Sequence, residues 1–223
     1  MGVLLLLPLA GCSALFTPPV QQKLYLLDGR AQHAGEASTG APQSATLIQR
    51  RPMFVVNPPH AAAGFDSPHI IYLQATHQLA YYANSDWVDT PARMLAPLVR
   101  AAVADHAGDA VAAPSAVAAD IWVDTEIEQL LQDFRLHPSE VRFTLRVYFV
   151  DYASRRVLAA RTFDMRVNAM SDDVAGGVAA ANSAVRQALD GLPELQREAV
   201  VRWRKSLLDA AARATPTPVI PAP

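Results

Sequence analysis

The sequence contains a single cysteine in 223 residues. One thiol cannot form an internal disulfide bond, so no disulfide framework holds this chain together. The histidines show none of the close pairs that zinc motifs use, and only one cysteine is present to supplement them. We therefore predict no metal site and no cofactor. The histidines in question are His33, His60, His69, His77, His106 and His137.

Motifs of two large enzyme classes are also missing. The chain has no Gly-x-Ser-x-Gly nucleophile elbow and no glycine-rich phosphate loop. Asp124, Glu126 and Glu128 share one face of a predicted strand, and two close carboxylates can act as acid and base. A solvated strand face is the commoner setting for such residues, because like charges in water need no partner. We predict that the protein is not an enzyme.

No strong charge of one sign is present, and the apolar run at the N-terminus is short. The formal net charge is -2, without the basic bias that nucleic-acid binding requires, so we predict no nucleic-acid partner. Residues Val3 to Ala10 fall well below the roughly 20 residues of a membrane-spanning helix, and Pro8 interrupts them. Half of the residues (51%) are hydrophobic although aromatics make up only 7%, so the chain can bury a core.

The N-terminus carries a processing signal. A short apolar run followed by small residues is typical of a secretory signal peptide. Leu9, Ala10, Gly11 and Cys12 match the lipobox that the bacterial lipoprotein signal peptidase recognises. We predict a signal peptide over residues 1–11, lipidation of Cys12 and a lipidated tether over residues 12–22. Lipidation also explains the single thiol.

Two features qualify this prediction. No Lys or Arg precedes the apolar run, which a start codon placed too late would explain. The alternative is a buried N-terminal strand that happens to contain a cysteine. Ser13 follows the cysteine, where lipoproteins retained at the inner membrane often carry Asp, so we expect the periplasmic face of the outer membrane.

The residues from 23 to 212 are predicted to form one α+β domain, followed by a disordered tail over 213–223. We expect a single, mainly antiparallel sheet with helices packed on one face. Alternating apolar residues predict strands, and Thr90-Pro91 predicts the start of a helix. Gly108 is expected to end that helix, and residues 110–119 are expected to form a loop. From Asp173 onwards we expect two further helices, which are divided at Gly191 and Pro193. The expected strands are Lys23–Leu27, Leu47–Val56, a hairpin of Ile70–Leu73 and Gln78–Tyr82, Ile121–Glu128, Arg142–Val150 and Val157–Val167.

Four aromatic residues gather around the expected hairpin and the entrance to the first helix. They are Tyr72, Tyr81, Tyr82 and Trp87. Such residues can line a lipid or partner surface, although core packing is their commoner use. We keep both interpretations.

Several segments, taken in order, resemble the ABC-type transport auxiliary lipoproteins, which include the lipoprotein of the paraquat-inducible envelope system. After the lipobox come Leu24-Tyr25-Leu26-Leu27 and Val55-Val56-Asn57-Pro58. The next segments follow in the family's order: Gly64 to Tyr72, the tyrosine pair Tyr81-Tyr82, and the helix entry from Trp87 to Pro91. Residues 120–134 and 141–163 match the family's later strands. The loop over residues 30–46 is longer than is typical.

The resemblance implies a function that residue chemistry alone does not. Members of this family serve as lipoprotein partners of systems built from an ABC transporter or permease and an MCE-domain protein, which move phospholipid or a similar lipid between the two membranes. The implied role is a non-enzymatic adaptor, and only Cys12 corresponds to a defined functional position. Two alternatives stay open: an envelope-assembly lipoprotein for lipopolysaccharide export or a Tol-like complex, and a periplasmic hydrolase with an unrecognised site. Exposed strand edges could also support a homo-oligomer.

Overall fold

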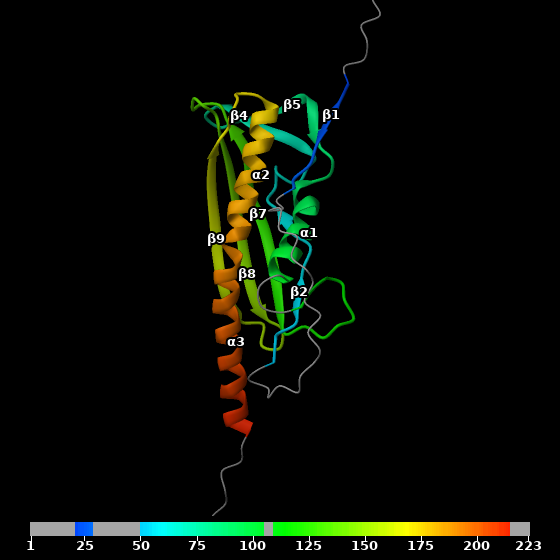
Figure 1. The fold of residues 1–223 in the computed structure, drawn as a ribbon, viewed down its shortest axis with the longest axis vertical. Helices are drawn as coiled ribbons and strands as arrows, with labels where there is room; N and C mark the ends of the chain where they lie inside the picture. Colours follow the sequence, from blue (N-terminus) through cyan, green and yellow to red (C-terminus); the bar gives the residue numbers. More distant parts are fainter. Residues whose placement is uncertain (1–20, 29–49, 105–108, 215–223) are drawn as a thin grey trace, which may run out of the picture.

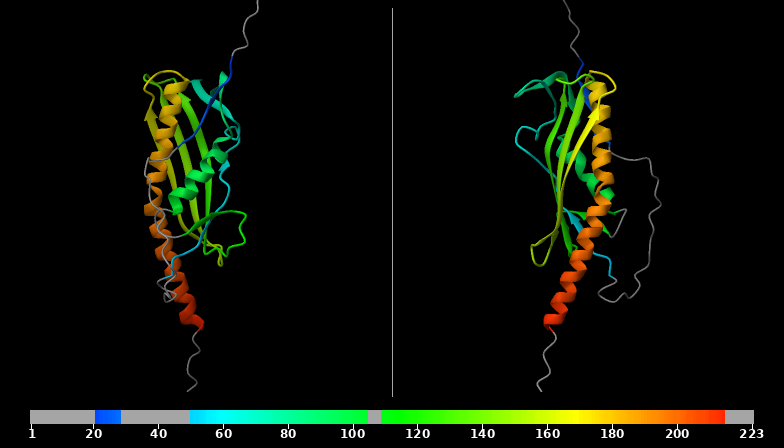
Figure 2. Two further views of the ribbon diagram at one scale, coloured as in Figure 1. Left: turned by 45° about the vertical axis from the view of Figure 1, so that its right-hand side comes forward. Right: turned by 90° about the vertical axis from the view of Figure 1, so that its left-hand side faces the viewer.

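The computed structural model describes residues 21–28, 50–104 and 109–214. Within these ranges three helices cover one face of a nine-stranded sheet (Figures 1 and 2), which confirms the predicted α+β class. None of the helices in the described ranges is both long and apolar enough to span a membrane. The elements are β1 (Lys23–Tyr25), β2 (Phe54–Val56), β3 (His60–Ala61), β4 (His69–Ala75), β5 (Gln78–Trp87), α1 (Pro91–Ala104), β6 (Ala110–Ala112), β7 (Ile121–Asp133), β8 (Glu140–Asp151), β9 (Val157–Asn168), α2 (Val174–Asp190) and α3 (Leu192–Ala214).

β7 is the strand around which the sheet is organised. Along one edge it pairs antiparallel with β8 over its whole length, and β8 pairs antiparallel with β9. Along its other edge it pairs in parallel with β2, β3 and β4 in succession. β5 joins β4 in an antiparallel hairpin, and β1 joins β5 in parallel. The long pairings are therefore antiparallel, as predicted, and the parallel ones are short.

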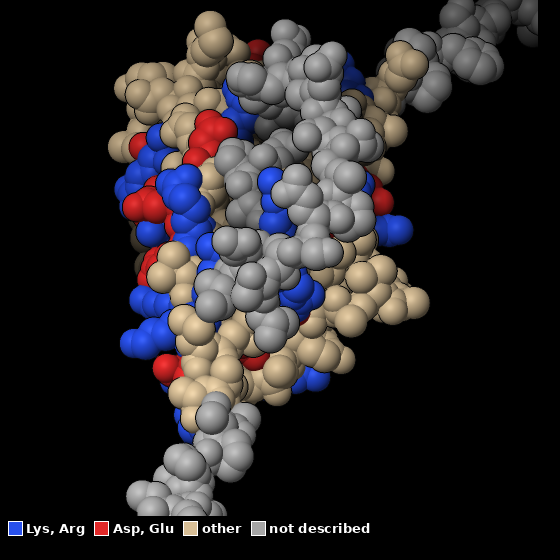
Figure 3. Space-filling view, turned by 60° about the horizontal axis from the view of Figure 1, so that its bottom comes forward, with Lys and Arg blue, Asp and Glu red and all other residues tan. Residues whose placement is uncertain are grey.

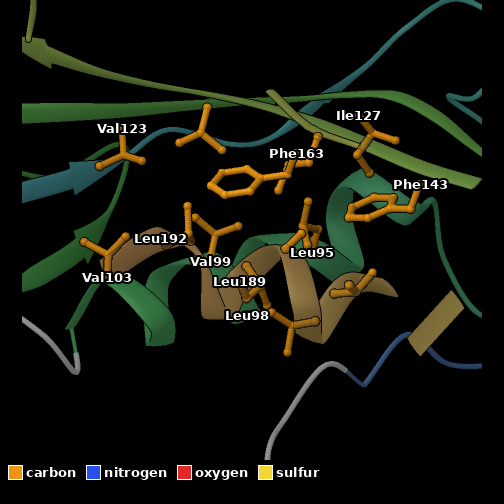
Figure 4. Close-up of a cluster of buried hydrophobic side chains, with 14 of the residues drawn as sticks. Leu95, Leu98, Val99, Val103, Val123, Ile127, Phe143, Phe163, Leu189 and Leu192 are labelled. Carbon is orange, nitrogen blue, oxygen red and sulfur yellow. The ribbon is translucent and has the colours of Figure 1, made fainter. Parts of the chain in front are cut away.

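The alternation of residues along β8 determines which face of the sheet the helices cover. Successive side chains of a strand point to opposite faces. The apolar set is fully buried, whereas the polar set on the other face is only partly buried. Figure 4 shows the resulting core, in which Leu95 and Val99 of α1 meet Phe143 of β8 and Phe163 of β9. The buried set of β8 comprises Val141, Phe143, Leu145, Val147 and Phe149.

The helices begin where the capping residues predict. Thr90 accepts hydrogen bonds from Arg93 N to its hydroxyl (3.4 Å) and from Met94 N to its carbonyl (3.1 Å) at the start of α1. Asp173 caps α2 by accepting the Gly176 amide at 2.7 Å. Gly191 separates α2 from α3, as expected. Gly108, the expected end of the first helix, lies outside the described residues.

Most of the predicted strands differ from the observed ones by one or two residues at an end, and three differ by more. The strand expected over Gln78–Tyr82 continues to Trp87. The strand expected over Leu47–Val56 begins only at Phe54, because Pro52 has no amide to donate to a sheet; residues 47–49 are outside the described ranges. β7 continues past Glu128 to Asp133. A register shift between Ile127 and Gln129 breaks the alternation there, so the pattern concealed the second half of the strand.

One further local prediction is wrong. The region 110–119, expected to be a loop, contains β6, which pairs in parallel with β2. The alanines of β6 favour a strand weakly, so this pairing depends on the neighbouring strand. Trp87 is the last residue of β5 and stands shortly before α1 begins at Pro91, at the helix entrance as expected.

Candidate functional site

The predicted site residues divide into two groups. Leu9, Ala10, Gly11 and Cys12 lie outside the described residues, so lipidation at Cys12 stays a prediction. The four aromatics lie on the β4–β5 hairpin, as the sequence indicated. The hairpin turns at Thr76-His77, where His77 adopts the left-handed backbone conformation (φ 65°).

Tyr81 is the predicted site residue with the most exposed side chain. Its relative exposure is 53%, and its ring lies 5.0 Å from the ring of His69, centroid to centroid. Nδ1 of His69 lies 2.9 Å from Oδ1 of Asp86, and the other carboxylate oxygen, Oδ2, accepts a hydrogen bond from Gln22 at 2.7 Å. Tyr81 therefore sits beside the first described residues of the chain, on a surface accessible to a partner.

Tyr72 and Tyr82 form a second aromatic group. Their rings lie 4.7 Å apart, and the ring of Phe134 stands edge-on to Tyr72 at 5.8 Å. The Tyr82 hydroxyl donates to Oε1 of Gln132 at 2.9 Å. Burial of the phenol, and next the neighbouring Tyr72, raise the pKa of Tyr82, so it stays protonated and remains a donor.

Gln132 connects this aromatic group to α2. Its side chain is buried, and its amide nitrogen donates to the Ser139 hydroxyl at 2.9 Å and to the Asp173 carbonyl at 3.2 Å. With Tyr82 donating from the other side, the buried amide is fully engaged. Apart from a polar residue type at a strand position, no sequence pattern indicated this network.

Trp87 belongs to the core rather than to a surface. It is 4% exposed and packs with the buried cluster beneath the helices. The structure thus brings Tyr72 and Tyr82 together, places Tyr81 apart beside His69, and removes Trp87 from any surface that a partner could reach.

A charged cluster at the end of β7 was not anticipated. Asp133 is fully buried and accepts hydrogen bonds from Arg135 at 2.7 and 2.9 Å, while Arg142 lies 2.8 Å away. The hydrogen bonds from Arg135 are the main cause that lowers the pKa of Asp133 to about 2. This carboxylate is paired on both sides, which gives it a structural role.

The three carboxylates considered as an acid-base group are partly engaged by neighbours. Asp124 accepts a hydrogen bond from the Asn57 amide at 2.5 Å, and Glu128 pairs with Arg146. The ion pair therefore compensates the charge of Glu128, while a neutral amide engages Asp124. In the part of the chain that the structure describes, no three His, Cys, Asp or Glu side chains come close enough together to hold a metal ion.

The interior behind the hairpin leaves little space. A cavity of about 10 Å³, which leaves room for about one water molecule, lies among residues of β4, β7 and α2, including Ile70, Gln132 and Gly177. It is far too small for an acyl chain. On the face seen in Figure 3, Lys and Arg side chains are interspersed with Asp and Glu along one side, with no large field of one sign.

Comparison with known proteins gives a consistent result. The family model described as "ABC-type transport auxiliary lipoprotein component" matches residues 34–192. A crystal structure of a Xanthomonas campestris protein superposes with a TM-score of 0.61 at 23% identity, covering 72% of this chain and 90% of that one. The crystal structure of an uncharacterized protein gives 0.58 at 11% identity, covering 78% and 97%. Both show the same fold. A search of curated proteins finds no match.

Proposed function

The chain belongs to the family of ABC-type transport auxiliary lipoprotein components, and from that premise we propose that it is a non-enzymatic adaptor of an MCE-type lipid transport system, anchored at the periplasmic face of the outer membrane. The observation that carries the proposal is the family match, which extends from residue 34 to residue 192. The lipobox ending at Cys12 supports the anchor and its address.

The shape of the described chain suits an adaptor. β1 and the first turn of α2 lie at one end of the molecule, and the last turns of α3 project beyond the sheet at the other (Figures 1 and 2). An anchor ahead of β1 would hold that end near the membrane and leave the flanks of the sheet, including the edge formed by β5, and the opposite end free to face a partner in the periplasm. The domain would then couple the membrane to a conduit by position, without chemistry of its own.

Tyr81 on the β4–β5 hairpin is the residue that we use to test whether this surface binds a partner. Tyr81 is exposed, and a tyrosine that keeps an apolar ring accessible is a common contact at protein interfaces. Tyr152, 42% exposed on the β8–β9 turn, is a matched control elsewhere in the fold.

The experiment is capture of cross-linked membrane complexes by the full chain, followed by identification of the captured proteins. We expect an MCE-domain protein and its permease, reduced severalfold by Tyr81→Ala and unchanged by Tyr152→Ala. Capture without any MCE-domain protein would contradict the proposal. Recovery of an outer-membrane barrel or a peptidoglycan-associated protein in its place would favour the envelope-assembly role.

A further inference from the structure

Three loops emerge side by side at one end of the sheet. In the strand register Leu73 of β4 lies opposite Asp133 of β7, Asp133 opposite Glu140 of β8, and Glu140 opposite Asn168 of β9. The β4–β5 turn, the β7–β8 turn and the segment from β9 to α2 all follow this row. β1 lies at the same end of the molecule (Figure 1). We call this the loop end.

Each of the three loops presents an exposed apolar side chain. Met170, between β9 and α2, is 95% exposed, which is extreme for a methionine in an ordered segment. Leu136 in the β7–β8 turn is 44% exposed, and Leu79, just after the β4–β5 turn, is 46% exposed. Exposed apolar side chains also occur singly elsewhere in the fold, but these three stand on or beside adjacent turns at one end, where they can enter an apolar phase together.

The acidic groups near these side chains are engaged by hydrogen bonds or ion pairs within the protein. Asp133 is held by Arg135 and Arg142. Asp172 accepts the Ser139 amide at 2.6 Å and lies 3.3 Å from His137, and Asp173 caps α2. The loop end can therefore approach an anionic surface without presenting these carboxylates unpaired.

We infer that the loop end rests on the lipid surface to which the chain is anchored, with Met170, Leu136 and Leu79 entering the interfacial layer. The inference rests on the proposed anchor at Cys12. Only nine residue steps separate Cys12 from Gln21, the first described residue, and an extended chain of that length spans about 30 Å at most. The anchor thus confines this end near lipid, where separate apolar tips can insert without a matching pocket.

The test uses the lipidated full chain, in which the Cys12 sulfur is blocked by its lipid. Three variants are prepared: Met170→Cys, Leu136→Cys and Leu208→Cys. In each variant the introduced cysteine has the only free thiol, which is labelled with an environment-sensitive fluorophore. Leu208, 47% exposed near the end of α3, is the matched control at the opposite end. The chains are reconstituted in vesicles of phosphatidylethanolamine and phosphatidylglycerol that contain lipids with nitroxide-labelled acyl chains.

We expect the nitroxide lipids to quench the probes at 170 and 136 at least twofold more strongly than the probe at 208. Vesicle-bound protein with equal quenching at all three positions would overturn the docking of the loop end and leave the anchor intact. Failure of the chain to float with vesicles would contradict the anchor itself, and the docking with it.

Discussion

The aromatic residues of the β4–β5 hairpin show to what extent the sequence can distinguish buried from exposed side chains. Tyr81 and Tyr82 are neighbours in a strand and so point to opposite faces, which makes one exposed and the other partly buried against Gln132. The sequence identified the aromatic group but could not show which face the helices cover. A register shift between His69 and Ile71 further alters the alternation along β4 and β5, so the burial of Trp87 could not be deduced from spacing.

Truncating two of these aromatics should therefore have opposite consequences. Trp87→Ala removes a side chain that is 4% exposed and should lower the free energy of unfolding by about 3–5 kcal/mol. Tyr81→Ala should cost less than about 1 kcal/mol, because half of that side chain is already in water. Urea unfolding at pH 7 measures both. A large loss for Tyr81→Ala would mean that its contact with His69 is structural, and its use as a binding probe would fail.

The paired carboxylate of Asp133 predicts a pH dependence of stability. Its pKa is lowered in the folded chain to about 2, from 3.8, so the folded state favours the ionised form. The resulting stabilisation, about 2 kcal/mol, is fully present above pH 4 and is lost as the pH falls from about 4 towards 2.

Asp133→Asn isolates this contribution from that of the other carboxylates. At pH 7 the variant should be about 2 kcal/mol less stable than the wild type, and the difference should shrink as the pH falls from 4 to 2. Denaturant unfolding of both proteins at a series of pH values measures this difference in the free energy of unfolding. A difference that stays constant across the acid range would show that Arg135 and Arg142 do not act through the charge of Asp133.

At the scale of elements, the long and strongly patterned segments were predictable and the short ones were not. β8, β9 and all three helices follow from the alternation or helical spacing of their apolar residues and from their capping residues. β3 and β6 contain two and three residues, and each exists through pairing with a neighbouring strand. A segment that short has no period to detect, so its strand state is decided by tertiary contacts.

The contact between α2 and β7 depends on the small size of Gly177. A Cβ at this position would collide with the side-chain amide of Gln132, which is held by hydrogen bonds to Tyr82, Ser139 and Asp173. Alanine favours a helix over glycine by about 1 kcal/mol, but the buried amide can move away only by breaking its hydrogen bonds. We expect Gly177→Ala to destabilise the protein by about 1–3 kcal/mol.

A double-mutant cycle distinguishes this collision from an effect on the helix alone. Gln132→Ala removes the obstructing amide, so Gly177→Ala should cost much less in that background. Thermal unfolding of the four chains supplies the cycle. Equal costs of Gly177→Ala in both backgrounds would rule out the packing of α2 on Gln132 as the cause.

At the scale of the whole molecule, the fold class came from the sequence pattern, whereas the assignment to transport came from family membership. The described residues form a body with β1 near one end and the last turns of α3 at the other, but they show no chemistry that names a cargo. β9 pairs only with β8 in the described ranges, so its outer edge is open to another chain, and a homo-oligomer stays a prediction.

The proposed anchor at Cys12 would decide the position of the whole molecule in the cell. Cys12 precedes the first described residue, so Cys12→Ser should leave the thermal unfolding of the domain unchanged while abolishing processing and lipidation. Acyl chains anchor a protein through about 0.8 kcal/mol per buried methylene, so their loss should release the chain from its own membrane address. To measure lipidation and location, cells are labelled with a palmitate analogue and their inner and outer membranes are separated. Label in the outer-membrane fraction of the wild type, absent from Cys12→Ser, is the expected result. Label in the inner membrane would contradict the address inferred from Ser13, and an unlabelled wild type would contradict lipidation at Cys12.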